Sequence, residues 1–131
     1  MMRKIVFALA VGTLSALLIS GFTFQKSKPK AGIQRIVCFK FKAGTSPEAI
    51  EKHMKGFAGL KKGIPQILSY SAGKTVVADG QGMPEYDVMH YTTYENEQAV
   101  LIYNKHAVHQ QFVAENKAIW EKVLVINSKL K

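Results

Sequence analysis

A tyrosine and two of the chain's four histidines lie within seven residues, in the segment YNKHAVHQQF that runs from residue 103 to 112. On a regular helix, Tyr103 and His106 are neighbours at i, i+3, and so are His106 and His109. A neutral imidazole, with an ordinary pKa of about 6.5, can accept a proton near pH 7, and a phenol can donate one to a carbonyl oxygen. Tyr103 and His109 are therefore sufficient, as donor and base, for cofactor-free proton chemistry beside a carbonyl group.

Other uses of these side chains compete with catalysis. A metal site needs three or four converging ligands, and two histidines without an acidic or sulfur partner nearby fall short, so no metal is expected. Haem needs one axial histidine and a large pocket, with His109 or His90 as the candidate ligand, although the primary expectation is no cofactor. In a purely structural interpretation, Tyr103 packs under a sheet, His106 caps the last carbonyls of one helix, and His109 begins the next helix.

The elements that must position these residues begin with a strand. The segment IQRIVCFKFK, residues 33–42, has the β-branched and aromatic composition of a strand. Because side chains alternate along a strand, Val37 and Phe39 lie on one face. Ile36 and Cys38 lie on the other face, so both sides of the sheet are apolar here. Such a sheet needs helices over one face and a second cover over the other, and a second subunit is the expected cover.

The remaining elements follow in a simple order. A helix is predicted over 44–63, with Thr45 and Glu48 as a capping box and with His53 solvated. The other predicted elements are strands over 66–77 and 85–94 around a loop at 78–84, a helical region over 95–122 that divides near 105–108, and a strand over 123–128. The order β-α-β-β-α-β predicts a ferredoxin-like α+β fold with an antiparallel four-stranded sheet. Its uncovered apolar face predicts a homodimer through the sheet faces.

Four stretches carry a resemblance to a known family: IVCFKFK, IPQILSYSAGK, YDVMHYTTYENEQAVLIY and YNKHAVHQQF. Together they resemble the stress-responsive A/B barrel family, often shortened to Dabb, over residues 33–127. The resemblance implies a homodimer in which two ferredoxin-like sheets close into one dimeric α+β barrel. In the polyketide-cyclising branch of the family, a tyrosine and the later histidine of the last stretch act in catalysis, and these positions match Tyr103 and His109.

Two positions depart from the family pattern. Members typically carry a histidine at the start of the first strand, where this chain has Arg35, and read His-Pro-x-His where this chain reads HAVH at 106–109. A guanidinium stays charged at physiological pH, so Arg35 is no base, but it can bind a carboxylate or a phenolate. The candidate residues are Arg35, His106 and His90 for ligand binding, and Tyr103 and His109 for catalysis.

The first residues differ in kind from the rest of the chain. MMRK is basic and residues 5–24 are almost wholly apolar, which is typical of a secretory signal peptide, here assigned to residues 1–23. The same run is long enough to span a bilayer, so an uncleaved membrane tether through residues 5–24 is the alternative. A lysine-rich linker over 24–32 then leads into one domain over 33–131. Export to the periplasm or the extracellular space is expected.

Composition narrows the classes of partner. The 131 residues include 18 Lys and Arg against 9 Asp and Glu, but the positive charges are scattered and accompany no nucleic-acid-binding motif, so no nucleic acid partner is expected. Cys38 is the single cysteine, which excludes an intramolecular disulfide and favours an inert buried thiol.

These observations favour an exported, homodimeric protein of the Dabb type that binds a small aromatic or apolar molecule. The first alternative is a cofactor-independent enzyme, polyketide-cyclase-like or monooxygenase-like, with His109 as base and Tyr103 as donor. The second alternative is a non-catalytic structural stress protein whose interior is filled. An enzyme or a binding protein needs a cavity that Tyr103 and His109 reach, whereas a structural protein needs none.

Overall fold

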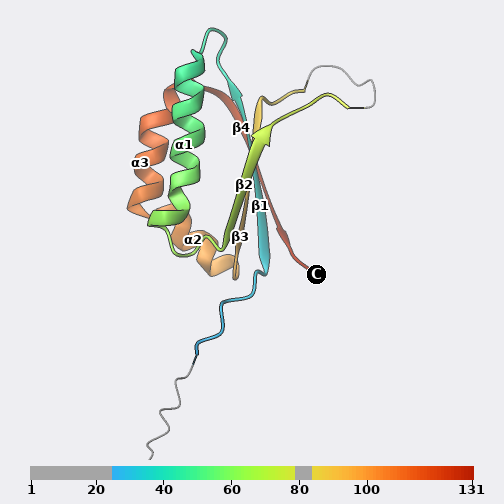
Figure 1. The fold of residues 1–131 in the computed structure, drawn as a ribbon, viewed down its shortest axis with the longest axis vertical. Helices are drawn as coiled ribbons and strands as arrows, with labels where there is room; N and C mark the ends of the chain where they lie inside the picture. The colour runs from blue at the N-terminus through green and yellow to red at the C-terminus, as the bar shows by residue number, and fades with distance from the viewer. Residues whose placement is uncertain (1–24, 79–83) are drawn as a thin grey trace, which may run out of the picture.

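The computed structural model describes residues 25–78 and 84–131, so the expected signal segment and most of the loop at 78–84 fall outside it. The elements are, in chain order, β1 (Ile33–Phe41), α1 (Pro47–Gly63), β2 (Ser69–Lys74), β3 (Val88–Tyr94), α2 (Glu97–Lys105), α3 (Ala107–Asn116), a 3-10 turn (Lys117–Ile119) and β4 (Trp120–Lys129). The strands pair antiparallel in the order β2-β3-β1-β4. Figure 1 thus confirms the predicted ferredoxin-like α+β fold. No helix in these two ranges is long and apolar enough to cross a membrane.

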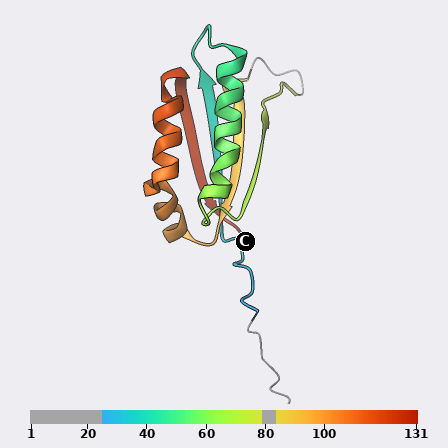
Figure 2. The same ribbon diagram turned by 60° about the vertical axis from the view of Figure 1, so that its left-hand side comes forward.

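The core lies between the sheet and its helices. Figures 1 and 2 show α1 and α3 side by side over one face of the sheet, with α2 at one end. The apolar residues buried in this layer include Ile33, Val37, Phe39 and Phe41 of β1, Phe57 and Leu60 of α1, Val88 and Tyr94 of β3, and Phe112 of α3. Burial of apolar surface stabilises the fold by roughly 25 cal/mol per Å², so this layer is the main source of stability.

Two glycines allow α1 and α3 to pack closely. A Cβ atom at Gly56 would lie 3.2 Å from the Phe112 ring, and one at Gly63 would lie 3.1 Å from the Val108 side chain. Both distances are shorter than ordinary van der Waals contact, so a larger side chain would push the helices apart. The lack of a side chain at Gly63 therefore lets the beginning of α3 pack against the end of α1, and the lack of one at Gly56 leaves room for the Phe112 ring.

The predicted capping box at the start of α1 is wrong by one residue. The Ser46 hydroxyl oxygen accepts from the Ala49 amide at 3.1 Å and is the N-cap, whereas the Thr45 hydroxyl donates to the Lys42 carbonyl at 2.6 Å. The Thr45 amide bonds to the same carbonyl, so Thr45 closes the turn before the helix. Pro47 occupies the first turn, where a missing N–H is harmless.

The C-terminal region corrects a second prediction. The helical region was expected to continue to residue 122, but α3 ends at Asn116 and the strand β4 begins at Trp120. β4 pairs with β1 from Phe41 opposite Trp120 to Ile33 opposite Lys129. These pairings join residues far apart in the sequence, and they prevail over the helical spacing of the apolar residues near the end of α3.

The sheet face away from the helices is apolar and only partly buried. Its apolar side chains are Ile36 and Cys38 of β1, Met89 and Tyr91 of β3, and Leu124 and Ile126 of β4. Met89 is 39% exposed and Ile126 is 49% exposed. Figure 2 shows no helix over this face. An exposed apolar patch that extends over three strands of a small domain indicates an interaction surface.

Candidate functional site

Arg35 points into the layer between the sheet and the helices, although it is charged. It follows Ile33 and precedes Val37 at alternate positions of β1, and both of these are core residues. Its guanidinium carbon lies 5.6 Å from the centroid of the Tyr103 ring, and its Nη1 donates to the Asn127 side-chain oxygen at 3.2 Å. The Arg35 Nε atom is buried and has no hydrogen-bond partner among the described residues. The site therefore contains a buried N–H group that can donate to a further acceptor.

Tyr103 closes the inner side of the same cluster. It lies near the end of α2 with 1% of its surface exposed, and its ring centroid is 5.4 Å from that of Tyr94. Burial raises the pKa of the Tyr103 hydroxyl well above its ordinary value, the neighbouring Tyr94 adds to this, and the charge of Arg35 acts in the opposite direction. The hydroxyl is thus neutral at physiological pH and can act as a hydrogen-bond donor.

His109 is oriented as a base. Its Nδ1 lies 3.1 Å from the Asn104 carbonyl oxygen, which can only accept, so Nδ1 carries the proton and Nε2 has a free lone pair. The ring centroids of His109 and Tyr103 are 4.4 Å apart. Burial lowers the pKa of His109, and the positive charge of Arg35 lowers it further against the opposing effect of the Asn104 hydrogen bond. The structure therefore brings Arg35, Tyr103 and His109 into one cluster.

His106 forms the junction that turns the chain between Tyr103 and His109. Its backbone is extended, with φ −63° and ψ 136°, which ends α2 and confirms the predicted division of the helical region. The His106 Nδ1 accepts from the Val108 amide at 3.1 Å and caps the start of α3. In the structural interpretation it was expected to cap the end of α2 instead. His106 thus positions its neighbours through a local hydrogen bond.

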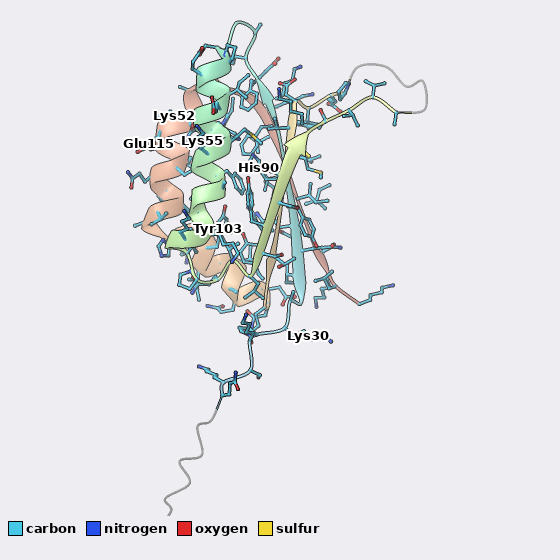
Figure 3. All side chains as sticks on the ribbon, in the orientation of Figure 1. Lys30, Lys52, Lys55, His90, Tyr103 and Glu115 are labelled. Carbon is cyan, nitrogen blue, oxygen red and sulfur yellow. The ribbon has the colours of Figure 1, made fainter. Side chains whose placement is uncertain are left out.

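His90 belongs to a different cluster. It lies on the same face of β3 as Tyr94 but four residues away, about 13 Å along the strand, and Figure 3 shows His90 and Tyr103 at different heights of the layer. The Nε2 atoms of His90 and His53 are 3.0 Å apart, and the His90 Nδ1 is 3.0 Å from the Tyr70 hydroxyl. Trp120 Nε1 donates to His53 Nδ1 at 3.0 Å.

The prediction that His53 is solvated is wrong, because none of its surface is exposed. Residues 53, 57 and 60 lie on one face of α1 at helical spacing, and residue 64, just after the helix, continues this spacing; Phe57, Leu60 and Ile64 are all core residues. This spacing was the available signal. It was obscured because Ile50 and Met54, on an adjacent face of the helix, are apolar too.

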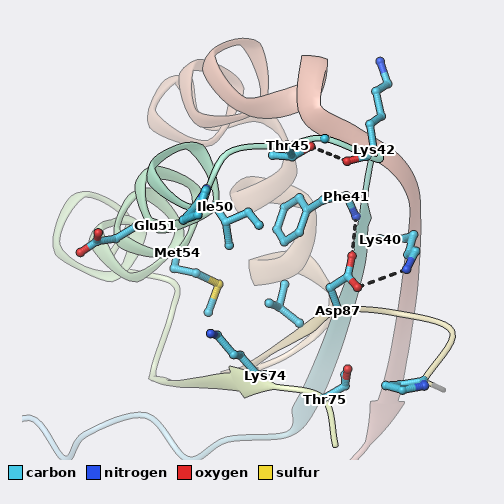
Figure 4. Close-up of a pocket in the computed structure, with 14 residues that line it drawn as sticks. Lys40, Phe41, Lys42, Thr45, Ile50, Glu51, Met54, Lys74, Thr75 and Asp87 are labelled. Carbon is cyan, nitrogen blue, oxygen red and sulfur yellow. Dashed lines mark hydrogen bonds and ion pairs between the residues drawn. The ribbon is translucent and has the colours of Figure 1, made fainter.

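The cavities on the surface of the described residues include the following three. One of about 840 Å³ has an apolar floor at Phe41, Ile50, Met54 and Val88, and Figure 4 shows Lys74 directed into it. A second, of about 520 Å³, lies between α1 and the end of α3. The third, of about 370 Å³, lies between α2 and β4 and is lined by Asn104 and Asn127, the hydrogen-bond partners of His109 and Arg35. Tyr103 and His109 themselves line none of the three.

The part of the chain that the structure describes contains no group of three or more His, Cys, Asp or Glu side chains positioned to hold a metal ion. The cluster of Arg35, Tyr103 and His109 offers a fixed cation with a free N–H at Arg35, a neutral phenol donor at Tyr103, and an imidazole acceptor at His109. The Arg35 N–H and the Tyr103 hydroxyl match an oxyanion, and the His109 acceptor can take up a proton.

Comparison with known proteins gives a consistent result. Residues 33–130 match the family model described as Stress responsive A/B Barrel Domain. The chain is 33% identical over 102 residues to the Stress-response A/B barrel domain-containing protein HS1 of Arabidopsis thaliana, covering 76% of this chain and 91% of that protein. A crystal structure from Arabidopsis thaliana aligns with a TM-score of 0.68 at 31% identity, over 76% of this chain and 95% of the other. A dimeric ferredoxin-like protein of unknown function from Thermobifida fusca aligns with a TM-score of 0.65 at 20% identity, over 76% and 92%.

Proposed function

The chain belongs to the stress-responsive A/B barrel family, and from this premise we propose that it is a homodimer that binds a small aromatic molecule with an anionic group between Arg35, Tyr103 and His109. The observation that carries the proposal is the buried Arg35 Nε without a hydrogen-bond partner among the described residues. A buried unpaired donor destabilises a protein by about 1–3 kcal/mol. A bound carboxylate or phenolate removes that cost by accepting from Nε.

The surroundings of Arg35 favour an aromatic ligand. The Tyr103 ring is tilted against that of Tyr94, with centroids 5.4 Å apart, and against that of His109, with centroids 4.4 Å apart, so a ligand bound beside Arg35 would meet aromatic rings. The groove of about 370 Å³ between α2 and β4 reaches Asn104 and Asn127 at the border of the cluster. This groove is the proposed entry, and its volume is at the small end of ligand sites.

Benzoate and its uncharged isostere benzamide test the proposal. Benzoate added to the full-length chain should shift the Arg35 Nε–H resonance in a 1H–15N spectrum, and benzamide should not. The variant Arg35→Met should lose benzoate binding. A matched control is Lys129→Met, which removes a positive charge from the same groove but only an exposed ion pair with Glu97. Equal binding of benzoate and benzamide, or an equal loss of benzoate binding in both variants, would reject the role of Arg35. If neither probe binds, the result favours the alternative of a structural protein with a filled interior.

A second candidate function is the cofactor-independent enzyme, and the orientation of His109 favours it. The Asn104 carbonyl fixes the proton on Nδ1 and leaves Nε2 free as a base next to the neutral Tyr103 phenol. The variant His109→Asn keeps a donor for the Asn104 carbonyl but lacks a base. On this hypothesis, His109→Asn and Tyr103→Phe abolish turnover of a poly-carbonyl substrate and still bind it. Turnover at the unaltered rate in either variant would exclude that residue as base or donor.

The proposed dimer uses the apolar sheet face that no helix covers. That face carries Met89, Leu124 and Ile126 with between 36% and 49% of their surfaces exposed, and the Thermobifida relative of the same fold is described as dimeric. Sedimentation of the full-length chain should give twice the monomer mass. Ile126→Glu should yield a monomer, whereas Leu101→Glu, an equally exposed site on α2, should not. A monomeric parent chain would contradict the dimer.

We further propose export of the domain, with residues 1–23 acting as a signal peptide or residues 5–24 remaining as a tether. The support is the basic MMRK followed by the apolar run. Cell fractionation with N-terminal sequencing of the product separates the two cases. A full-length chain in the cytoplasmic fraction would contradict both.

A further inference from the structure

The second buried cluster links four elements through side-chain hydrogen bonds and is not used in the proposed function. Its members are Trp120 at the start of β4, His53 on α1, His90 on β3 and Tyr70 on β2. We propose that this Trp120–His53–His90–Tyr70 hydrogen-bond chain is an acid-sensitive contact, which holds α1 to the sheet only while both imidazole rings are neutral.

The direction of the hydrogen bonds in this chain follows from the donor at one end. Trp120 Nε1–H can only donate, so His53 Nδ1 must be without a proton, and a neutral His53 then carries its proton on Nε2. That N–H points at His90 Nε2, 3.0 Å away, which must accept. A neutral His90 therefore has its proton on Nδ1 and donates to the Tyr70 oxygen at 3.0 Å. One arrangement of protons satisfies all three contacts.

An added proton has no place in this arrangement. A proton on His53 Nδ1 would face the Trp120 N–H, and a proton on His90 Nε2 would face the His53 N–H. In either case two donors oppose each other and one hydrogen bond is lost in the core, where an unpaired polar group is costly. Protonation therefore separates β4 from α1, or α1 from β3.

Among the described residues, the side chains that stack on the two rings or bond to them are aromatic and carry no fixed charge. The aromatic rings of Phe39 and Phe41 on β1, Phe57 on α1, and Phe112 on α3 pack against them. β2 contributes the neutral hydroxyl of Tyr70, and β4 contributes the indole of Trp120. Each histidine ring therefore has the other histidine as a titratable hydrogen-bond partner, and His90 also has Tyr70. Burial lowers the pKa of His53 to about 4 and that of His90 to about 3, with the neighbouring His53 also acting on His90.

The sign of the pH effect follows from these values. In the unfolded chain both histidines take up protons below pH 6.5, whereas in the folded chain they stay neutral down to about pH 4. The contribution of the two neutral histidines to the free energy of unfolding is therefore complete at pH 7 and is lost as the pH falls below 6.5. With two protons involved, the folding equilibrium constant should fall by up to about a hundredfold per pH unit.

Urea unfolding of the full-length chain between pH 7.5 and 5.0 tests the proposal with two variants. Trp120→Phe removes the fixed donor, so His53 Nδ1 can hold one proton in the folded state and the slope should fall to about tenfold per pH unit. Phe112 packs against the rings of His53 and Trp120 without a hydrogen bond. Phe112→Leu should therefore lower the free energy of unfolding equally at all pH values and leave its pH dependence unchanged. Equal slopes in the parent and Trp120→Phe would overturn the proposal.

Nitrogen-15 spectra of the histidines in the parent chain give an independent result that does not depend on whether a variant folds. At pH 7 the expected tautomers are Nε2–H for His53 and Nδ1–H for His90. A proton on His53 Nδ1, or a charged ring in either residue at pH 7, would overturn the proposal.

Discussion

Two buried polar clusters of this chain differ in how completely their hydrogen-bonding groups are matched. In the central cluster, each of the four ring nitrogens of His53 and His90 has a partner at 3.0 Å. In the cluster at the end of the helices, the Arg35 Nε is unpaired among the described residues, and His109 uses only its Nδ1 in a hydrogen bond. The histidine nitrogens of the central cluster are therefore all paired without a ligand, whereas the cluster of Arg35 and His109 keeps a nitrogen of each residue unpaired.

The difference teaches where function can be sought in a small domain. Buried polar groups are normally paired because an unpaired one destabilises the fold, so a persistent exception indicates a group kept for another partner. The central histidines attract attention by their types and burial, yet their lone pairs are all occupied. Of the described residues in these two clusters, Arg35 and His109 are the ones that keep a nitrogen free for a ligand.

The largest expected effect is on stability, at the central cluster. His90→Ala removes a stacked ring and leaves His53 and Tyr70 without their partner, so the free energy of unfolding at pH 7 should fall by about 3–5 kcal/mol. Chemical denaturation measures this loss. Arg35→Met should change the same quantity by less than about 1 kcal/mol, because the loss of the hydrogen bond to Asn127 is offset by the removal of the buried unpaired Nε–H. Similar losses in the two variants would erase the distinction between the clusters.

The next effect is on ligand binding, at the other cluster. A hydrogen bond to a charged group contributes about 1.5–3 kcal/mol, so Arg35→Met should weaken benzoate binding by roughly tenfold to a hundredfold. Isothermal titration calorimetry gives the ratio of dissociation constants. His90→Gln serves as the comparison, since His90 belongs to the other cluster and lies opposite Val37, two residues along β1 from Arg35. An equal loss in that variant would argue that general loosening, and not the guanidinium, weakens binding.

A smaller effect is expected at the end of the central chain. Tyr70→Phe removes the acceptor of the His90 Nδ1–H, and the free energy of unfolding should fall by about 1–2 kcal/mol. Tyr91→Phe is the matched control, because its hydroxyl makes only a long contact of 3.4 Å with Gln34 on the other face of the sheet. If the denaturation curves of the two variants superimpose, the Tyr70 hydroxyl contributes no more to the free energy of unfolding than the Tyr91 hydroxyl does.

The smallest effect concerns the pH dependence of binding. The pKa of His109 is lowered by burial and by Arg35, so the neutral form of its ring predominates from pH 6.5 to 8. Benzoate affinity should then vary by less than about twofold across this range. Calorimetry at the two limits measures it. Binding that strengthens tenfold at pH 6.5 would mean that His109 becomes charged and attracts the anion, contrary to the burial of its ring.

Much of the fold could be predicted, because the signals that specify it are local. Alternating apolar residues marked β1, and the extended His106 appears where a junction between two helices was expected. The end of α3 could not be found this way. Trp120 continues the helical spacing of the preceding residues, and only its pairing with Phe41 on β1 makes it the first residue of a strand.

The candidate site was likewise predicted in part. Tyr103 and His109 are close in sequence, so their proximity follows from any turn near His106. Arg35 lies almost seventy positions earlier, and only the family pattern drew attention to it. Its contact with Tyr103 depends on the register of β1 and on the packing of α2 against the sheet.

The sequence by itself determined the order of elements, the two apolar faces of the sheet and the types of group available for chemistry, because periodicity, capping and composition act over a few residues. The tertiary structure alone decided which of those groups are matched. His53 and His90 are 37 positions apart in the chain, and Trp120 is 67 positions from His53. Whether a nitrogen is paired depends on distances of about 3 Å between such remote residues, and these distances exist only once the sheet and helices have packed.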